Sequence, residues 1–309
     1  MSLTYESNSN EILMAICSNL QDINRKLRGF IKLASFRPYG WPLVVFMSIL
    51  LMISFQSGLH NPGLLGLSSL AFVLTCSGGY AINDYFDRES DAIAHPERPI
   101  PSKVLSPTVV VQFTVVTFAA ALGVGLMINP LAFGIIVFNI VFLILYPSFF
   151  KRRLWFLSNV AIGLVEGITV PIFAEAALFQ RVSVISLSFT GIVFAGIGFN
   201  IIKDALGVNG DAKVGYLTLA IKRGPRTAVK VGAVLCFIAP ITFVFPYVVG
   251  VVSAAYLIPI VLMGCIELLF VLSLFRNPNA QNVKKGVRAG VIPVLLFPIA
   301  LILGTFLLR

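Results

Sequence analysis

The residues of this chain best suited to chemistry lie in one polar segment, NDYFDRESDAIAHPERPIPSK (83–103), which follows a long apolar stretch. Within it, Asn83, Asp87 and Asp91 are spaced by four residues, so on a helix their oxygen atoms lie along one face. Carboxylates this close repel one another unless a cation lies among them, and Mg²⁺ shared with a substrate phosphate is the usual occupant. The segment therefore predicts diphosphate chemistry on a lipid-soluble substrate at a membrane boundary.

A second polar segment, KDALGVNGDAKVGYLTLAIKRG (203–224), repeats the first at a distance of 120 residues. The shift aligns three pairs of positions: Asp84 with Asp204, Asp87 with Gly207, and Asp91 with Asp211. The two segments together hold seven of the 13 acidic residues of the chain. Acids beside an apolar stretch are often solvated helix ends. Their concentration at matching positions of two related halves instead favours one shared site.

Long apolar runs must position these two segments. The chain is 58% hydrophobic and 12% charged, far beyond the apolar share of a soluble domain. Apolar runs of roughly 17–25 residues predict membrane-spanning helices. We expect nine, at about 40–56, 64–82, 106–127, 131–149, 156–177, 184–202, 228–248, 251–274 and 289–307. Four helices separate the polar segments, so the repeat is parallel. The sequence predicts an all-α membrane protein with nine transmembrane helices in two parallel pseudo-repeats around a central cavity.

Basic residues predict the orientation of these helices. With the N-terminus in the cytoplasm, 21 of the 23 Lys and Arg residues fall in cytoplasmic segments, and only Arg181 and Arg309 fall outside. Both polar segments are then cytoplasmic, in a multi-pass protein of the cell (inner or plasma) membrane. The net charge of +10 reflects this topology and contact with anionic lipid. Nucleic-acid binding is excluded because it would call for a soluble basic domain.

The N-terminal part of the chain differs from the rest. Between Ile12 and Ala34, apolar residues recur at helical spacing and basic residues follow them. This pattern predicts a helix that lies on the cytoplasmic leaflet. We expect residues 1–35 to form a cytoplasmic interfacial segment and residues 36–309 to form a single transmembrane domain.

The first polar segment resembles the NDxxDxxxD signature of the UbiA superfamily of intramembrane prenyltransferases. The HPERPIPSK that ends it is similar to the continuation in the digeranylgeranylglyceryl phosphate synthase and chlorophyll synthase branches. The second segment matches the family pattern GD-(x)3-G-(x)2-TL-(x)4-G between Gly210 and Gly224. Tyr146 followed by Lys151 and Arg152, and then Asn159 in the next helix, resembles a further recurrent stretch. The resemblance covers nearly the whole chain.

The resemblance implies Mg²⁺-dependent transfer of a prenyl group from its diphosphate to a lipophilic acceptor. The expected prenyl group is geranylgeranyl, and the expected acceptor is a geranylgeranylglyceryl phosphate-like lipid. The implied catalytic residues are Asn83, Asp87 and Asp91 at a first metal site, with Asp84 adjacent, and Asp204 and Asp211 at a second. The implied substrate-binding residues are Arg88, Arg98, Lys103, Tyr146, Lys151, Asn159, Lys203 and Lys222. Cations among them would neutralise the departing pyrophosphate.

The second segment departs from the family pattern. Gly207 and Asn209 stand where many members carry Asp and Glu, so the second site lacks a strong ligand. Two other enzyme functions stay open: a terpene cyclase on the same scaffold, and prenylation of an aromatic or chlorophyllide acceptor. A transporter is disfavoured because the charges lie at the membrane boundary and the repeat is not inverted.

One further acid lies inside an apolar run. Glu166 falls seven residues after Asn159 and so near the same helix face. Acids within lipid are costly and tend to face a cavity, which makes Glu166 a candidate for a cavity or acceptor role. A neutral, hydrogen-bonded glutamic acid with a structural role is the alternative. Glu267, which has no motif neighbours, is expected to be structural.

Overall fold

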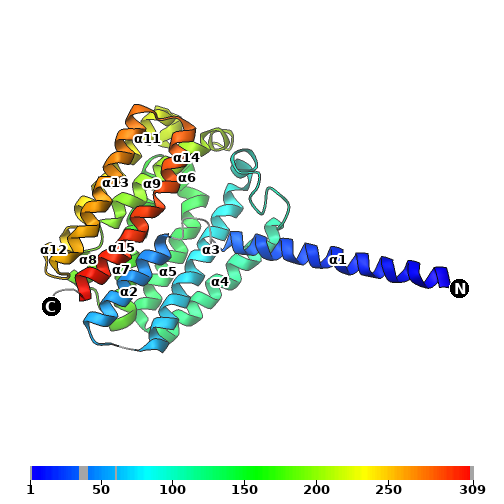
Figure 1. The fold of residues 1–309 in the computed structure, drawn as a ribbon, viewed down its shortest axis with the longest axis horizontal. Helices are drawn as coiled ribbons and strands as arrows, with labels where there is room; N and C mark the ends of the chain where they lie inside the picture. The colour runs from blue at the N-terminus through cyan, green and yellow to red at the C-terminus, as the bar shows by residue number, and fades with distance from the viewer. Residues whose placement is uncertain (1, 35–40, 60, 307–309) are drawn as a thin grey trace.

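A computed structural model describes residues 2–34, 41–59 and 61–306, and all its regular elements in those ranges are helical (Figure 1). The longer helices are α1 (Ser2–Leu33), α2 (Trp41–Gln56), α3 (Pro62–Ala94), α4 (Pro107–Ile128), α5 (Pro130–Leu145), α7 (Leu157–Phe179), α9 (Ile192–Lys213), α11 (Pro225–Thr242), α13 (Leu257–Arg276), α14 (Ala280–Ala289) and α15 (Val291–Phe306). The short ones are the π-helix η1 (Tyr146–Phe150), α6 (Lys151–Arg153), α8 (Val184–Leu187), α10 (Leu219–Arg223), α12 (Phe245–Val248) and η2 (Ala254–Tyr256).

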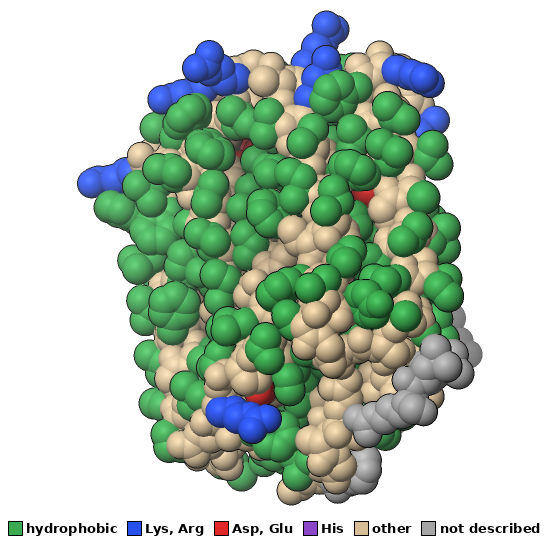
Figure 2. Space-filling model, turned by 90° about the vertical axis from the view of Figure 1, so that its left-hand side faces the viewer, with side chains coloured by type: hydrophobic (Ala, Val, Ile, Leu, Met, Phe, Trp, Pro, Cys, Tyr) green, Lys and Arg blue, Asp and Glu red, His purple; other side chains and the backbone are tan. Residues whose placement is uncertain are grey.

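Eight helical segments of the described chain are long and apolar enough to cross a membrane. The remaining predicted run, 40–56, corresponds to α2. This helix is apolar, but its 16 residues make it shorter than the eight segments above. Figure 2 shows hydrophobic side chains covering most of one face, with most of the visible Lys and Arg side chains at one end. The prediction of an all-α membrane fold is confirmed, whereas the count of nine spans is not.

Several helices start where a polar residue precedes a proline. Asn61, Ser106 and Asn129 cap α3, α4 and α5, and each side chain accepts a hydrogen bond from the backbone N–H three residues on. The proline that follows each cap has a φ suited to the first helical turn and no N–H group to leave unpaired. These pairs fix where three of the spans begin.

The first part of each polar segment is helical, which corrects two predicted boundaries. The expected spans 64–82 and 184–202 end too early, because α3 continues to Ala94 and α9 to Lys213. The end of an apolar run does not end a helix when the polar residues that follow are satisfied by partners from other helices. Residues 83–94 and 203–213 are thus the C-terminal ends of long helices, and the rest of each polar segment follows its helix.

These two helix ends pack directly against each other. A Cβ atom on Gly210 would lie 2.5 Å from the backbone oxygen of Ser90, so only glycine allows this approach of α9 to α3. The predicted repeat therefore places its two polar segments side by side in space.

Helix α1 projects away from the bundle (Figure 1). Leu20, Ile23 and Leu27 on α1 are each 57–61% exposed, whereas Leu33 at its end is buried against Leu105 and its neighbours. The predicted boundary between residues 35 and 36 falls outside the described residues. A location of α1 on the membrane surface stays a prediction.

Candidate functional site

Asp87 is the carboxylate on which the most elements converge. Lys151 donates from Nζ to both of its oxygens, at 2.9 and 2.7 Å. The Tyr216 hydroxyl donates to Oδ1 at 2.9 Å, and the Asn83 amide donates to Oδ2 at 2.8 Å. Asp87 and Lys151 are both buried. One carboxylate therefore joins α3 to the loop after α9 and to the segment that follows α5.

The backbone that presents Lys151 has an unusual form. Helix α5 continues into the π-helical turn η1, and the Lys151 N–H donates to the carbonyl oxygen of Tyr146, five residues back. Single π-helical turns are often found at functional sites because they change the direction of the side chains that follow. Tyr146 and Lys151 both line the same cavity as a result.

The second motif is bonded to the first and to α7. The Ser90 hydroxyl donates to Asp211 Oδ1 at 2.8 Å, which connects α3 with α9. The Asn159 amide donates to Asp204 Oδ2 at 2.8 Å, which connects α7 with α9. Three helices thus hold the two acids of the second motif in place.

Arg98, in the loop after α3, supplies a second cation at the first motif. Its guanidinium donates to Asp91 and lies 3.5 Å from Asp84 Oδ1. All three side chains are largely buried. The loop after α3 therefore folds back over the end of its own helix.

Tyr216 and Ser90 are the site residues that the sequence did not single out. Burial, together with the nearby Asp87 carboxylate, raises the pKa of the Tyr216 phenol, which therefore remains a hydrogen-bond donor at neutral pH. Tyr216 lies at a variable position of the family pattern and Ser90 lies between two acids, so neither had a distinctive signal.

Three of the expected substrate-binding cations lie away from the cavity. Arg88 packs on its neighbour Tyr85 and pairs with Glu89, while Lys103 is exposed. Lys222 lies 4.9 Å from the centre of the Trp155 ring. None of the three lines the cavity described below.

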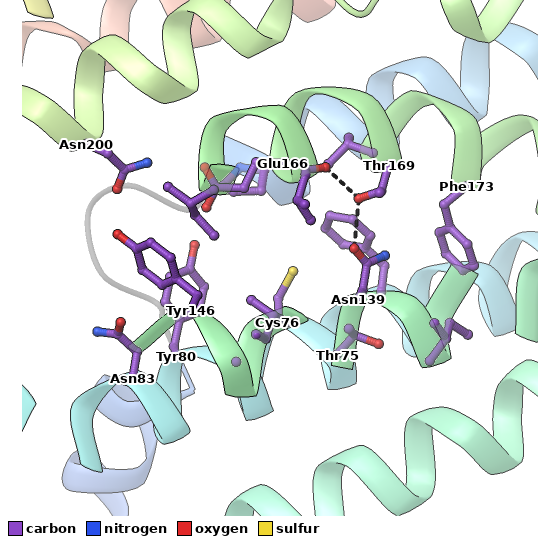
Figure 3. A pocket seen from close by; sticks show the side chains of 18 of the residues that line it. Thr75, Cys76, Tyr80, Asn83, Asn139, Tyr146, Glu166, Thr169, Phe173 and Asn200 are labelled. Atoms are coloured by element: carbon purple, nitrogen blue, oxygen red, sulfur yellow. Dashed lines mark hydrogen bonds between the residues drawn. The ribbon is translucent and has the colours of Figure 1, made fainter. Parts of the chain in front are cut away.

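A cavity extends from Asn83 and Asp204 into the bundle, and Figure 3 shows side chains from α3, α5, η1, α7 and α9 around it. Asp84, Asp87, Asp91 and Asp211 lie next to this end of the cavity but do not line it. Its polar end includes Asn83, Lys151, Lys203 and Asp204. Its apolar walls include Phe72, Ile136, Leu143, Ile162, Val170 and Phe173. Phe72 stacks on Phe46, with ring centres 4.1 Å apart, which closes that wall. The cavity has the form expected for an amphipathic ligand with a charged head and an apolar chain.

The donor atoms at the polar end suit Mg²⁺. They are carboxylate and amide oxygens, and Asn159 Oδ1, beside Asp204, is a buried acceptor without a hydrogen-bond partner among the described residues. Within the same residues, no three Asp, Glu, His or Cys side chains converge as a ready metal cage. Mg²⁺ commonly takes only one or two carboxylates and completes its shell with water and substrate phosphates. The residues therefore fit a metal that binds together with a diphosphate.

Comparisons with known proteins agree with this geometry. Residues 43–304 match the family model described as the UbiA prenyltransferase family. A digeranylgeranylglyceryl phosphate synthase of Natronomonas pharaonis is 33% identical over 208 residues, which is 67% of this chain and 74% of the relative. A solved structure of digeranylgeranylglyceryl phosphate synthase superimposes with a TM-score of 0.66 at 26% identity, over 92% of this chain and 99% of that one.

The fold is also that of a more distant solved protein. A UbiA homologue from Archaeoglobus fulgidus, bound to GPP and Mg²⁺, superimposes with a TM-score of 0.63 at 18% identity, over 89% of this chain and 99% of that one. The match to the family model extends over most of the transmembrane bundle, including both motif helices. The chain belongs to the UbiA prenyltransferase family.

Proposed function

We propose that this membrane prenyltransferase moves a geranylgeranyl group from its diphosphate to the free hydroxyl of a geranylgeranylglyceryl phosphate-like lipid. The name of the 33% identical relative supports this acceptor. The solved homologue with GPP and Mg²⁺ supports a prenyl diphosphate donor and this metal. The one-sided distribution of Lys and Arg supports a cytoplasmic position for the site.

The observation that carries the proposal is the meeting of two acidic helix ends at the head of an apolar cavity. Asp87 and Asp211 come from motifs 120 residues apart, and the contact between Ser90 and Asp211 joins their helices at 2.8 Å. A solvated pair of helix ends would not need to be buried, as Asp87 and Asp211 are, or to lie at the head of a cavity lined by Asn83 and Asp204. A diphosphate-headed lipid needs both its polar head and its chain to be accommodated.

Mg²⁺ would be held by Asn83, Asp87 and Asp91 from the first motif and by Asp204 and Asp211 from the second. When bound, it supplies positive charge that binds the diphosphate and makes it a better leaving group. The protein contributes the oxygen ligands and holds them in position through Tyr216, Ser90 and Asn159, as described above.

Two lysines of the chain act on the leaving group directly in this account. Lys151 and Lys203 both line the polar end of the cavity. Their positive charge stabilises the negative charge that develops on the pyrophosphate as the bond to the prenyl carbon breaks. Lys151 also neutralises Asp87 in the absence of substrate, because two of its hydrogen bonds go to that carboxylate.

The remainder of the cavity suits the prenyl chain and the reactive carbon. Phe72, Phe173 and the aliphatic walls exclude water, which limits capture of the allylic cation by hydrolysis. Aromatic faces also stabilise a nearby cation.

The proposal is tested by incubating the purified protein with geranylgeranyl diphosphate, Mg²⁺ and a panel of acceptors, followed by product mass analysis. The panel contains geranylgeranylglyceryl phosphate, chlorophyllide, an aromatic acid and no acceptor. We expect a digeranylgeranylglyceryl phosphate mass only with the first.

The other outcomes separate the alternatives. A cyclised hydrocarbon in the absence of any acceptor would identify a terpene cyclase and contradict the proposal. A prenylated chlorophyllide or aromatic acid would retain the prenyltransferase and replace the acceptor. No product from any mixture would contradict the proposed reaction.

A further inference from the structure

Glu166 is an acidic residue of the cavity that the diphosphate site does not use. It lies on α7 and lines the cavity together with Asn200 and Tyr146 (Figure 3). Its Oε2 atom is buried and has no hydrogen-bond partner among the described residues. A buried carboxylate oxygen without a partner is costly, and each such group calls for an explanation. A donor supplied by a ligand in the cavity is the explanation that this position favours.

Neighbouring polar groups of the cavity do not share this property. Thr169, one turn further along α7, donates from its hydroxyl to Asn139 Oδ1 at 2.9 Å (Figure 3). Asn200 donates to the Gly196 carbonyl oxygen at 2.9 Å. The Asn200 side chain also interacts with the Glu166 carboxyl group. Oε2 itself lies beside Gly196 on α9, and no described residue donates a hydrogen bond to it.

The position of Glu166 is fixed by close packing of α7 on α9. Cβ atoms on Gly163 and Gly167 would lie 2.3 Å from Ile197 and Val193, so these glycines allow the two backbones to touch. Glu166 lies between them in sequence, and its Oε2 would be 3.5 Å from a Cβ on Gly196. The backbone that carries Glu166 is therefore packed closely on α9, beside the cavity that its side chain lines.

Glu166 lies between the diphosphate end of the cavity and its apolar end. It is seven residues beyond Asn159, or about 10 Å along the helix axis at 1.5 Å per residue. Side chains on a helix tilt toward its N-terminus, so the carboxyl group reaches back toward the Asp204 that Asn159 contacts. The prenyl carbon that reacts is attached directly to the diphosphate, so it lies in this part of the cavity.

We infer that Glu166 binds the hydroxyl of the acceptor lipid and accepts its proton during transfer, an inference that rests on the proposed function. The acceptor oxygen forms a bond to the prenyl carbon while its own O–H bond breaks. The bond between that carbon and the diphosphate oxygen breaks, and its electron pair leaves with pyrophosphate. The proton passes to the Glu166 carboxylate.

The variant that tests this inference is Glu166→Gln, which keeps the size of the side chain and removes the basic oxygen. Loss of a general base lowers rates by roughly 10²–10⁴-fold, so we expect transfer to the hydroxyl acceptor to fall at least about 100-fold. Release of pyrophosphate from geranylgeranyl diphosphate without acceptor should stay within about twofold of wild type. Glu267→Gln, which changes another acid inside a span but outside this cavity, should leave both rates unchanged.

An acceptor analogue with a thiol in place of the hydroxyl supplies a readout that a structural role would not affect. A thiol ionises near pH 8.5 without a strong base, so the deficit of Glu166→Gln should shrink to less than about tenfold. Transfer within threefold of wild type in Glu166→Gln, or an equal loss of acceptor-free pyrophosphate release, would overturn the inference.

The controls separate this inference from the proposed function. If the wild-type protein transfers to the hydroxyl acceptor and Glu166→Gln does so equally well, only the inference fails. If the wild-type protein forms no product with the hydroxyl acceptor, the proposed function fails and the inference fails with it.

Discussion

Two regions of the molecule bury carboxylates and use them in opposite ways. Near the end of α7, Glu175 is fully buried and accepts hydrogen bonds from three residues that follow it in sequence. Ser183 donates through its hydroxyl and its backbone N–H, at 2.6 and 2.9 Å. Ser186 does the same at 2.6 and 3.3 Å, and Arg181 donates at 3.1 Å. This carboxylate is saturated by nearby chain and ties the loop after α7 to the start of α8.

Asp87 and Asp211 at the motif end have distant partners, whereas Asp91 is bonded by Arg98, seven residues away. Asp87 is bonded by Lys151 and Tyr216, which are 64 and 129 residues away in sequence, and Asp211 by Ser90, which is 121 residues away. The cavity reaches this cluster through Lys151 and Asp204. Glu175 thus closes its hydrogen-bond shell with partners 6–11 residues away and lines no cavity of the motif end. Asp87, Asp204 and Asp211 are instead held by residues from other helices or distant loops, and Asp204 lines the cavity.

The largest loss of activity is expected from a substitution at Asp87, and it tests the difference between the two regions. Asp87→Asn keeps a hydrogen-bond acceptor for Tyr216 but removes the charge that holds the cation. We expect pyrophosphate release from geranylgeranyl diphosphate to fall by at least about 10³-fold, the loss seen when a main electrostatic group of a site is removed. The rate is measured in detergent or nanodiscs by coupled detection of pyrophosphate.

Glu89→Ala is the matched control for Asp87→Asn. Glu89 belongs to the same motif, but its side chain is 68% exposed, and Arg88 is its one ion-pair partner in the described part of the chain. Its removal should leave the rate within about twofold, because exposed ion pairs contribute little. Activity that survives in Asp87→Asn would show that the motif end is structural, as the Glu175 region is.

A smaller effect, on stability rather than on rate, is expected at Glu175. Glu175→Gln removes the charge and one of the two acceptor oxygens that Ser183 and Ser186 share. Hydrogen bonds to a charged group contribute about 1.5–3 kcal/mol each, so the midpoint of thermal unfolding should fall by several degrees. The catalytic rate below that midpoint should be unchanged. A variant with unaltered stability but reduced turnover would reverse the roles assigned to the two regions.

The smallest effect is expected at Gly207, where the second motif lacks the carboxylate that Asp87 supplies in the first. A Cβ atom here would meet only Asp211 Oδ2, at 3.7 Å, so a side chain fits and lies beside the site. Gly207→Asp should lower the Mg²⁺ concentration needed for half-maximal rate by roughly 5–30-fold, equivalent to about 1–2 kcal/mol for a charge-assisted contact.

Gly207→Ala separates size from charge in that experiment. It should leave the Mg²⁺ dependence unaltered, since it adds volume without a ligand. If both variants instead lower turnover or change the product at the same Mg²⁺ dependence, Gly207 makes room for substrate and the second motif does not lack a metal ligand at this position.

Part of this site could be predicted from sequence because its geometry is local. A spacing of four residues places Asn83 and Asp87 on one helix face, and the structure shows them hydrogen-bonded at 2.8 Å. The 120-residue repeat likewise predicted that the two motifs meet, because related helical halves place equivalent ends together. Hydropathy predicted membrane-spanning helices because it depends only on the composition of each apolar run, which is also a local property.

The rest depends on relations between helices that a sequence does not encode locally. The contact between Ser90 and Asp211 requires a particular rotation of α3 against α9, set by close packing at Gly210. The hydropathy pattern ended α3 at residue 82, although the helix runs to Ala94. Similarly, only the folded structure distinguishes Glu175, whose two oxygens both accept hydrogen bonds, from Glu166, whose Oε2 accepts none from the described residues. Both are glutamates on one apolar helix.

The central claim is that the buried acids of both motifs act on a prenyl diphosphate through Mg²⁺. The most direct measurement is pyrophosphate release from geranylgeranyl diphosphate as Mg²⁺ is removed by a chelator and then restored. Clustered carboxylates repel a diphosphate unless a cation lies between them. Release should therefore fall to background in excess chelator and recover fully when Mg²⁺ is added back. Full turnover in excess chelator would contradict the account.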